Sequence, residues 1–330
     1  MSNLEKEPAE LLSEWPRTAV AAVEILAPRD VPLGGPRAMG VRRTLPQRRR
    51  SLIGAWCFVD HYGPDAMPGA NSAEQGGMVV PPHPHTGLQT VSWLFSGEID
   101  HRDSVGSHAL VRPGELNLMT AGRGIAHSEV SMAATTVLHG AQLWLALPDE
   151  SRHGEPFFEH YVPEPVAFGA TELRVFIGSL VGQMSTATVF SDLVGAQIDL
   201  PAGASVDLPV DPRFELGVLL DTGAISVQGE ELPLSHLAYL EPGIASLRLQ
   251  AGDTAARILL IGGVPLGESI VMWWNFIGRS HDEIVQFRAE WQADVIQGER
   301  VDGRFGLVAG YDGSALPAPE LPNVRLRPRD

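Results

Sequence analysis

Two pairs of potential metal ligands stand out in the sequence, each with its members two residues apart. His83 and His85 form the first pair, and His127 and Glu129 form the second. Side chains alternate between the two faces of a β-strand, so residues i and i+2 point the same way. Two strands that present these pairs to one interior would bring three imidazoles and a carboxylate together. This donor set suits a first-row transition metal.

A structural role for each histidine is the alternative interpretation. A single histidine is more often a hydrogen-bonded structural residue than a ligand, and a His-x-His triplet is common by chance. Two such pairs framed by predicted strands and glycine turns are much rarer, which favours a metal site. Imidazole and carboxylate ligands suit Fe(II), Mn(II), Ni(II), Co(II) or Cu(II), whereas Zn(II) favours a closed four-coordinate site without redox chemistry.

Short antiparallel strands are predicted to bring the two pairs together. Residues 90–95 are rich in β-branched and aromatic side chains and stop at a turn signal over 96–98. Another turn is indicated at Arg112-Pro113-Gly114-Glu115. Pro84 cannot donate a ladder hydrogen bond, so the histidine pair is expected at a strand start or a sheet edge.

Composition points to a globular all-β protein. The chain has 330 residues, of which 44% are hydrophobic, and its 35 glycines and 26 prolines favour many turns over a helical bundle. A net charge of −16 argues against general affinity for nucleic acid or anionic membranes. No apolar run reaches membrane-spanning length. The N-terminus is polar, unlike a secretory signal, and Cys57 is the only cysteine, so we expect a cytoplasmic protein.

Four segments are predicted. Residues 1–20 form a flexible acidic arm, residues 21–165 a first β-barrel with the metal site, residues 166–295 a second barrel, and residues 296–330 an extended tail.

The second half resembles the first. Residues 214–224 can be laid over 88–98, which places Pro209 and Asp211 where the first half has its histidine pair. The second barrel is therefore expected to bind no metal. A helix should begin after Ser280, with Ile284, Phe287 and Trp291 on one face packed against a barrel.

Two further groups of polar residues have two interpretations each. Asp60 and His61 follow a predicted strand over 51–59, where they would either line a substrate pocket or stabilise a turn. The arginines between Arg42 and Arg50 would either bind an anion or a protein partner, or form a solvated loop paired with nearby acids.

Four motifs together resemble the pirin family. They are Asp60-His61-Tyr62-Gly63-Pro64, His83-Pro84-His85-Thr86-Gly87, His101-Arg102-Asp103-Ser104 and the run from Thr120 to Glu129. The resemblance is specific over residues 20–165 and looser through 295. It implies a bicupin, with two antiparallel β-barrels (double-stranded β-helices) head to head and a few short helices. The family's metal ligands match His83, His85, His127 and Glu129, and Gln89 stands where other cupins have a glutamate ligand.

The resemblance also implies a function. Pirins are similar to quercetin 2,3-dioxygenases, so we expect one divalent metal, Fe(II) before the others, and cleavage of a flavonol or related aromatic by O₂. Glu129 would then act as general base, with Asp60, His61 and Gln89 near the substrate. Vertebrate pirin is described instead as an iron-dependent transcriptional co-regulator, so a metal-sensing protein with a protein partner and no turnover is the alternative. A different cupin reaction is a third hypothesis.

Overall fold

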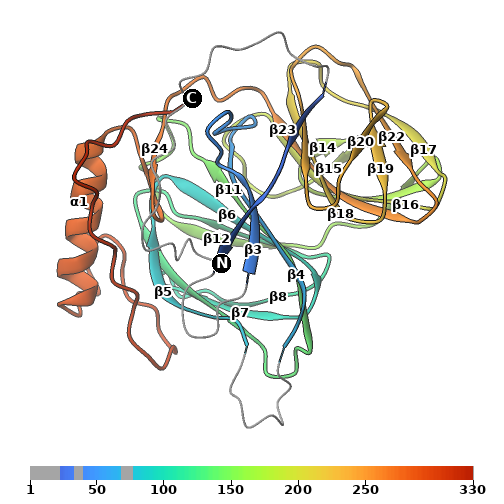
Figure 1. Ribbon diagram of the computed structural model, residues 1–330. Coiled ribbons are helices and arrows are strands. Elements are labelled where there is room, and N and C mark those ends of the chain that lie inside the picture. The colour runs from blue at the N-terminus through green and yellow to red at the C-terminus, as the bar shows by residue number, and fades with distance from the viewer. Residues whose placement is uncertain (1–22, 33–39, 68–76, 330) are drawn as a thin grey trace.

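The chain folds almost entirely into antiparallel strands. The computed structural model describes residues 23–32, 40–67 and 77–329, and the acidic arm expected over residues 1–20 lies outside them. Figure 1 shows two halves: blue to green strands of the first lie beside yellow and orange strands of the second. In each half a larger sheet and a smaller sheet enclose an interior. The predicted all-β bicupin class is confirmed, although paired sheets, as in a jelly roll, take the place of continuous closed barrels.

The first half supplies one large and one small sheet. The large sheet has the order β12 (Phe157–Tyr161), β9 (Leu116–Thr120), β6 (Leu88–Ser96), β11 (Val137–Ala146), β4 (Trp56–Ala66), β3 (Gly40–Leu45), β2 (Arg29–Pro32). The small sheet has the order β5 (Val79–His85), β10 (Ile125–Ser131), β7 (Ile99–Asp103), β8 (His108–Val111).

The second half repeats this arrangement. Its large sheet has the order β1 (Glu24–Leu26), β21 (Leu237–Leu240), β18 (Glu215–Thr222), β23 (Ala256–Gly263), β16 (Leu193–Leu200), β14 (Thr171–Leu180), β13 (Val166–Phe168), with β15 (Gln183–Met184) on β14. Its small sheet has the order β17 (Ser205–Pro209), β22 (Ser246–Ala251), β19 (Ile225–Val227), β20 (Glu230–Leu232).

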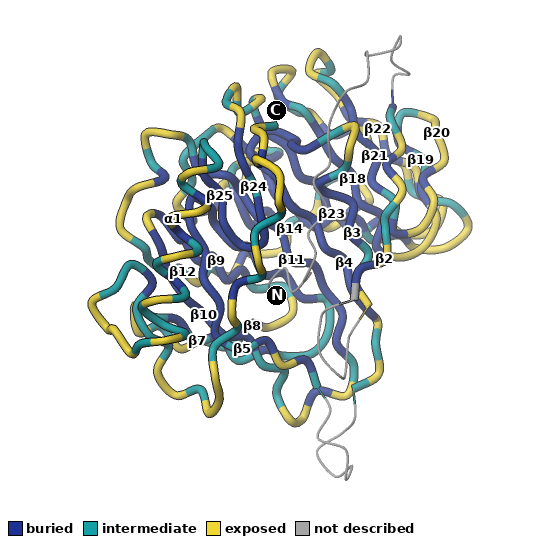
Figure 2. Tube along the Cα trace, turned by 60° about the vertical axis from the view of Figure 1, so that its left-hand side comes forward, coloured by how far each residue is buried: buried dark blue, intermediate teal, exposed yellow. Residues whose placement is uncertain are grey.

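The two large sheets pack face to face and join the halves. Trp93 of β6 stacks on Phe176 of β14 with ring centroids 4.5 Å apart, and its indole N–H donates to Gln197 of β16 at 2.9 Å. Such an aromatic pair contributes about 0.5–1.5 kcal/mol beyond its buried area. Both faces of these central strands are covered, which is why β6 reads as a nearly unbroken buried run. Figure 2 shows this buried centre in dark blue, with the exposed residues in the surrounding loops.

The two ends of the described chain cross between the halves. Strand β1 pairs with β21 of the second half, although residues 21–26 were expected to open the first barrel. In the other direction, β24 (Val271–Trp273), β25 (Phe276–Gly278), helix α1 (His281–Trp291), the π-helical turn Gln292–Ile296 and the tail pack beside β5 and β10 of the first half (Figure 1). The Leu316 N–H donates to Pro82 O at 2.8 Å, and the Ile277 N–H donates to Thr86 O at 3.0 Å. Each half is thus completed by chain from the other end.

Several local predictions can be compared with these elements. Helix α1 begins as expected, because the Ser280 side chain accepts from the Glu283 N–H, and Ile284, Phe287 and Trp291 are buried. Strand β5 is an edge strand, as Pro84 indicated, but the histidines lie at its end, not its start. Near the end of the segment expected to form the first barrel, Phe157–Tyr161 contributes β12 to the first large sheet.

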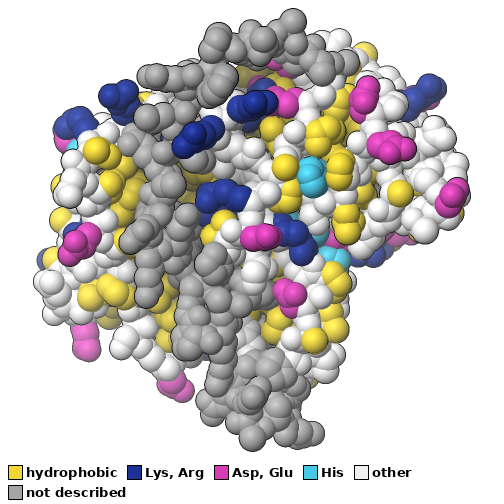
Figure 3. Space-filling model, viewed as in Figure 1, with side chains coloured by type: hydrophobic (Ala, Val, Ile, Leu, Met, Phe, Trp, Pro, Cys, Tyr) yellow, Lys and Arg dark blue, Asp and Glu magenta, His cyan; other side chains and the backbone are white. Residues whose placement is uncertain are grey.

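The arginines between Arg42 and Arg50 mostly have internal partners. Arg43 binds the Asp60 carboxylate through two hydrogen bonds of 2.6 and 2.8 Å, with both side chains buried. Arg50 pairs with Glu24 at 2.9 Å and lies over the Tyr239 ring. Of the two interpretations, pairing with nearby acids is the one that fits. Arg43 makes its pair from strand β3 and Arg50 from the segment after it. On the face drawn in Figure 3, acidic and basic side chains are interspersed among apolar ones.

A buried polar bridge also joins the halves. His61 of β4 and His139 of β11 both contact one carboxylate oxygen of Asp221, a residue of β18, at 2.7 and 2.6 Å. Arg257 of β23 lies 3.4 Å from the other oxygen. Burial opposes the charged form of Asp221, yet the hydrogen bonds from His139 and His61 lower its pKa to about 2. Burial likewise lowers the pKa of His61, although Asp221 acts against that shift.

Asp221→Asn should destabilise the protein by roughly 3 kcal/mol at pH 7, the usual cost of breaking a buried ion pair. The folded pKa of Asp221 lies below its unfolded value, so its contribution is present above about pH 4 and lost as pH falls toward 2. Urea unfolding at several pH values measures the free energy of unfolding of both proteins. The difference between wild type and variant should become smaller below pH 4. Asp207→Asn, which removes an exposed pair with Arg248, serves as control with little effect. A gap that widens in acid would contradict this assignment.

Candidate metal centre

The four predicted ligands converge inside the first half. Strands β5 and β10 pair antiparallel with His127 opposite His83, and a bulge follows between His127 and Glu129. His83, His85, His127 and Glu129 are all fully buried. The donor nitrogens of the three histidines lie within 4.8 Å of one another. The structure thus brings the three histidines together, and Glu129 lies beside His127 in a second grouping of potential ligands that also contains His101.

The hydrogen bonds of the histidines leave lone pairs facing the cluster. His83 Nδ1 donates to Pro81 O at 2.8 Å, so its Nε2 is an acceptor. That buried nitrogen has no hydrogen-bond partner among the described residues. His85 Nε2 lies 3.1 Å from His127 Nε2. Two unprotonated imidazole nitrogens at this distance repel each other unless a proton or a cation lies between them. This arrangement fits a metal ion.

Burial keeps these imidazoles neutral. It lowers the pKa of His83 to about 3 and holds the pKa values of His85 and His127 well below their usual range. A histidine must be neutral to bind a metal, so no proton has to be displaced at pH 7. The donor set is ready for a cation.

The centre occupies a polar layer between two apolar clusters of the barrel interior. Phe58, Leu88 and Trp144 belong to the cluster on one side, and Leu94 and Leu138 to the cluster on the other. In the layer between, Ser92 Oγ lies 3.1 Å from Glu129 Oε1 and 3.0 Å from the Gln142 side-chain oxygen. Gln142 stands opposite Ser92 on one neighbouring strand and opposite Asp60 on the other. Ser92 therefore holds the Glu129 carboxylate from the large sheet.

The three residues expected near the substrate are not grouped with the ligands. Asp60 shares the interior polar layer, but Arg43 engages both of its oxygens. His61 and Gln89 point to the other face of the large sheet, where His61 contacts Asp221 and Gln89 donates to Thr188 O at 3.0 Å. Asp60 and His61 also lie within β4, not at a strand end. His61 therefore belongs to the polar bridge with Asp221, and Gln89 contacts the second half through Thr188.

Sequence reasoning assigned no role to Ser92 and Gln142. Both are polar residues on the interior face of strands whose other interior residues are largely apolar, and that alternation is the signal that could have found them. His101 and Asp103, quoted only as a motif, also lie beside the centre, with His101 Nδ1 3.4 Å from His127 Nδ1.

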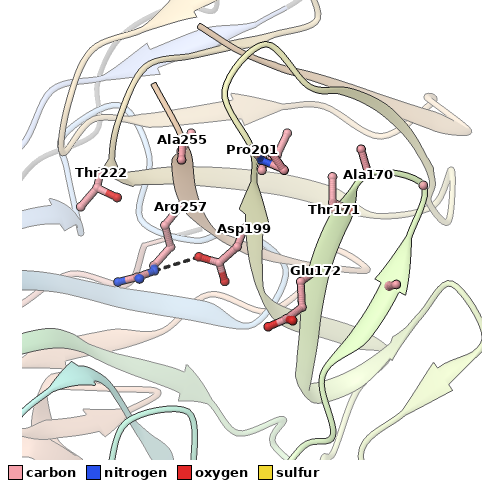
Figure 4. Close-up of a pocket in the computed structure, with 12 residues that line it drawn as sticks. Ala170, Thr171, Glu172, Asp199, Pro201, Thr222, Ala255 and Arg257 are labelled. Carbon is pink, nitrogen blue, oxygen red and sulfur yellow. Dashed lines mark hydrogen bonds and ion pairs between the residues drawn. The ribbon is translucent and has the colours of Figure 1, made fainter. Parts of the chain in front are cut away.

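The surface pocket in Figure 4 belongs to the second half. Its volume is about 490 Å³, and its charged lining residues are Glu172, Asp199 and Arg257. Arg257 donates to Asp199 at 3.0 Å, and Glu172 pairs with Arg174 at 2.8 Å, so each of these charges has an internal partner. None of the four candidate ligands lines this pocket.

The interior of the second half is apolar at the corresponding position. In β17 and β22 the buried residues are Val206, Leu208, Leu247, Leu249 and Ala251. Pro209, placed opposite a histidine by the sequence comparison, is exposed, and Asp211 lies in the following turn bound to Arg213. The overlay of the two halves of the sequence was therefore shifted by at least one residue at this point. It placed Asp211 within a strand, but β17 ends at Pro209.

The bridge of His61, His139 and Asp221 is also a grouping of potential ligands. Arg42 lies 3.3 Å from His61 Nδ1, and because a guanidinium only donates, that nitrogen is the acceptor. His61 Nε2 then carries the proton that it donates to Asp221, and has no lone pair for a metal. Two nearby arginines, Arg42 and Arg257, further disfavour a cation there.

The protein should accordingly bind one metal ion per chain and not two. Elemental analysis after desalting of protein loaded with excess Fe(II) or Ni(II) measures the ratio directly. A second tightly held ion that survives substitution of His127 would contradict the assignment. His127 belongs to both ligand groupings of the first-half interior, so within the described residues such an ion would have to come from the second half or from the bridge.

A two-cupin protein with a histidine and carboxylate centre in its first half is the class that the fold and site define. The Pirin family profile matches residues 38–145, and that of the Pirin C-terminal cupin domain matches residues 195–297. The chain is 42% identical over 296 residues to a Pseudomonas aeruginosa protein named "Putative quercetin 2,3-dioxygenase", covering 89% of each. The chain belongs to the pirin family.

Solved structures agree with this membership. The crystal structure of quercetin 2,3-dioxygenase from Acinetobacter baumannii superposes with a TM-score of 0.84 at 37% identity, covering 93% of this chain and 97% of that one. A bacterial pirin from Escherichia coli in complex with nickel(II) gives a TM-score of 0.57 at 18% identity, covering 74% and 99%. The second likeness supports the fold alone. Within the described residues, no helix has the length and apolarity needed to cross a membrane.

Proposed function

We propose that this pirin is a metal-dependent dioxygenase that cleaves the ring of a flavonol or a related aromatic compound with O₂ in the cytoplasm. The observation that carries the proposal is the group of three neutral imidazoles and Glu129 in one buried layer. The names of its relatives support the choice of substrate class.

His83, His85, His127 and Glu129 would hold one divalent ion, for which we favour Fe(II), with Mn, Ni, Co, Cu and Zn as alternatives. When bound, such an ion supplies Lewis acidity and a place where O₂ and an electron-rich substrate meet. Glu129 would accept the proton of the substrate hydroxyl as general base. Ser92, 3.1 Å from Glu129 Oε1, would orient that carboxylate by donating its hydroxyl proton to it. Trp144, whose ring lies edge-on to His85, would help exclude water.

The test is anaerobic reconstitution with Fe(II) followed by addition of O₂ and a panel of flavonols and catechol-like compounds. We expect oxygen uptake and release of carbon monoxide in proportion to metal content. Stoichiometric metal binding without oxygen uptake on any member of the panel would defeat the dioxygenase proposal.

A second candidate is a metal-sensing protein that binds a protein partner without turnover. Complete burial of the four side chains in the described part of the chain favours it, because a sensor, unlike an enzyme, needs no path for an aromatic substrate. Metal-dependent association with a partner, in a protein that consumes no oxygen, would distinguish this function from catalysis.

A further inference from the structure

A chain of three buried side chains leads from the turn after β7 to the metal centre. The Asp103 carboxylate Oδ2 lies 3.3 Å from His101 Nε2, and His101 Nδ1 lies 3.4 Å from His127 Nδ1. His101 and Asp103 are each 2% exposed. Strand β7 is hydrogen-bonded to β10 with Asp103 opposite His127, so the sheet itself sets these side chains in line.

The carboxylate end of the chain is fixed. Asp103 Oδ1 accepts the backbone N–H groups of Val105 at 3.1 Å and Ser107 at 2.8 Å, within the turn that connects β7 to β8. Only Oδ2 is left to face the imidazole. The ring of His101 stacks on Phe158 with centroids 4.7 Å apart, which holds its plane.

The direction of the hydrogen bonds follows from the donors available. A carboxylate only accepts, so a His101 ring with a single N–H carries it on Nε2, and its Nδ1 is then the acceptor. His127 Nδ1 must then carry a proton to donate to it. The lone pair of neutral His127 is consequently on Nε2, the nitrogen that faces His85.

We propose that Asp103 and His101 are positioning residues that fix the tautomer of His127, so that its Nε2 is ready to bind metal. The inference rests on the proposed metal centre and adds to it two residues that need not touch the ion. An outer hydrogen-bond partner of a ligating histidine typically changes metal affinity by about ten- to a hundredfold.

Asp103→Asn tests the inference with little change of volume. The amide oxygen can keep both turn hydrogen bonds, while the amide nitrogen takes the place of Oδ2 and donates. Every bond in the chain then reverses: His101 Nε2 accepts, His101 Nδ1 donates, and His127 is left protonated on Nε2. The fold should persist, because each polar group keeps a partner.

The first measurement is Co(II) affinity by competition with a chelator. Asp103→Asn should bind roughly ten to a hundred times more weakly than wild type, at an unchanged urea midpoint of the metal-free protein. Asp100→Asn is the matched control, because Asp100 lies on the same strand with its side chain turned outward to Arg102 and His108. It should bind Co(II) like wild type. Equal affinity of all three proteins would overturn the inference.

The second measurement needs no metal. Nitrogen-15 correlation spectra of labelled histidines in the metal-free protein report which ring nitrogen is protonated. We expect His127 protonated on Nδ1 in wild type and on Nε2 in Asp103→Asn; the same tautomer in both would overturn the inference. If wild type binds no Co(II), the proposed function fails, but these spectra still decide the role of Asp103.

The variant His101→Ala separates positioning from direct ligation. A positioning residue leaves the four ligands in place, so its loss should weaken binding by about ten- to a hundredfold, and at saturating Co(II) the absorption spectrum should match that of wild type. A changed spectrum at full loading would show His101 to be a ligand and would overturn its positioning role.

Discussion

His127→Ala should abolish metal binding while leaving the protein folded. His127 lies opposite His83 and 3.1 Å from the donor nitrogen of His85, so its loss removes the ligand that the other two face. The affinity should fall by more than about a hundredfold, because even an outer partner of a ligand contributes ten- to a hundredfold. The apolar clusters on both sides of the polar layer remain, so the urea midpoint of the metal-free protein should change only modestly.

His108→Ala is the control for this experiment. His108 is on β8 of the same small sheet, but its side chain is exposed and pairs with Asp100. It should load one ion per chain, as wild type does. Stoichiometric metal retained by the double variant of His83 and His127 would remove the four-residue centre from consideration.

Glu129→Gln should bind metal more weakly and lose most of its turnover. Glutamine keeps an oxygen donor and nearly the same volume but lacks the charge and basicity of glutamate. If Glu129 accepts the substrate proton, turnover per bound metal falls by about two to four orders of magnitude. Oxygen uptake at saturating metal measures this effect separately from affinity. Ser92 should still hold the side chain in place, since its hydroxyl also donates to an amide oxygen, although more weakly than to a carboxylate.

Glu155→Gln is the matched control, because Glu155 is exposed and pairs with Arg123 near the turn that precedes β10. It should leave turnover unchanged. If Glu129→Gln keeps activity per bound metal within a few-fold of wild type, Glu129 is a ligand and not the base.

The metal centre was predictable because it depends on local rules. Strand alternation places His83 with His85, and Pro84 marks an edge strand, so both conclusions follow from residues within one strand. The turns predicted between the two pairs then allowed the strands that carry them, β5 and β10, to lie side by side. The exception was the bulge after His127, which shifts the pairing and has no clear signal in the sequence.

The substrate pocket expected around Asp60, His61 and Gln89 stays a prediction, but the direction of the His61 side chain could not be predicted. The expected strand ended at Val59, whereas β4 continues to Ala66 through an irregularity in its pairing with β11. Because the strand passes through, His61 takes its place in the alternation and points to the second half. Its partner Asp221 is 160 positions away, and no local pattern predicts such a contact.

The exchange of chain ends between the halves bears on how the protein is made. Ribosomal synthesis releases the strands of the first half long before Leu316, whose N–H bonds to Pro82 beside the histidine pair. The small sheet that carries the ligands is therefore uncovered during most of translation and is closed only when the last segment emerges. If the four residues bind a metal, the ion can enter in that interval, before the segment around Leu316 packs beside Pro82.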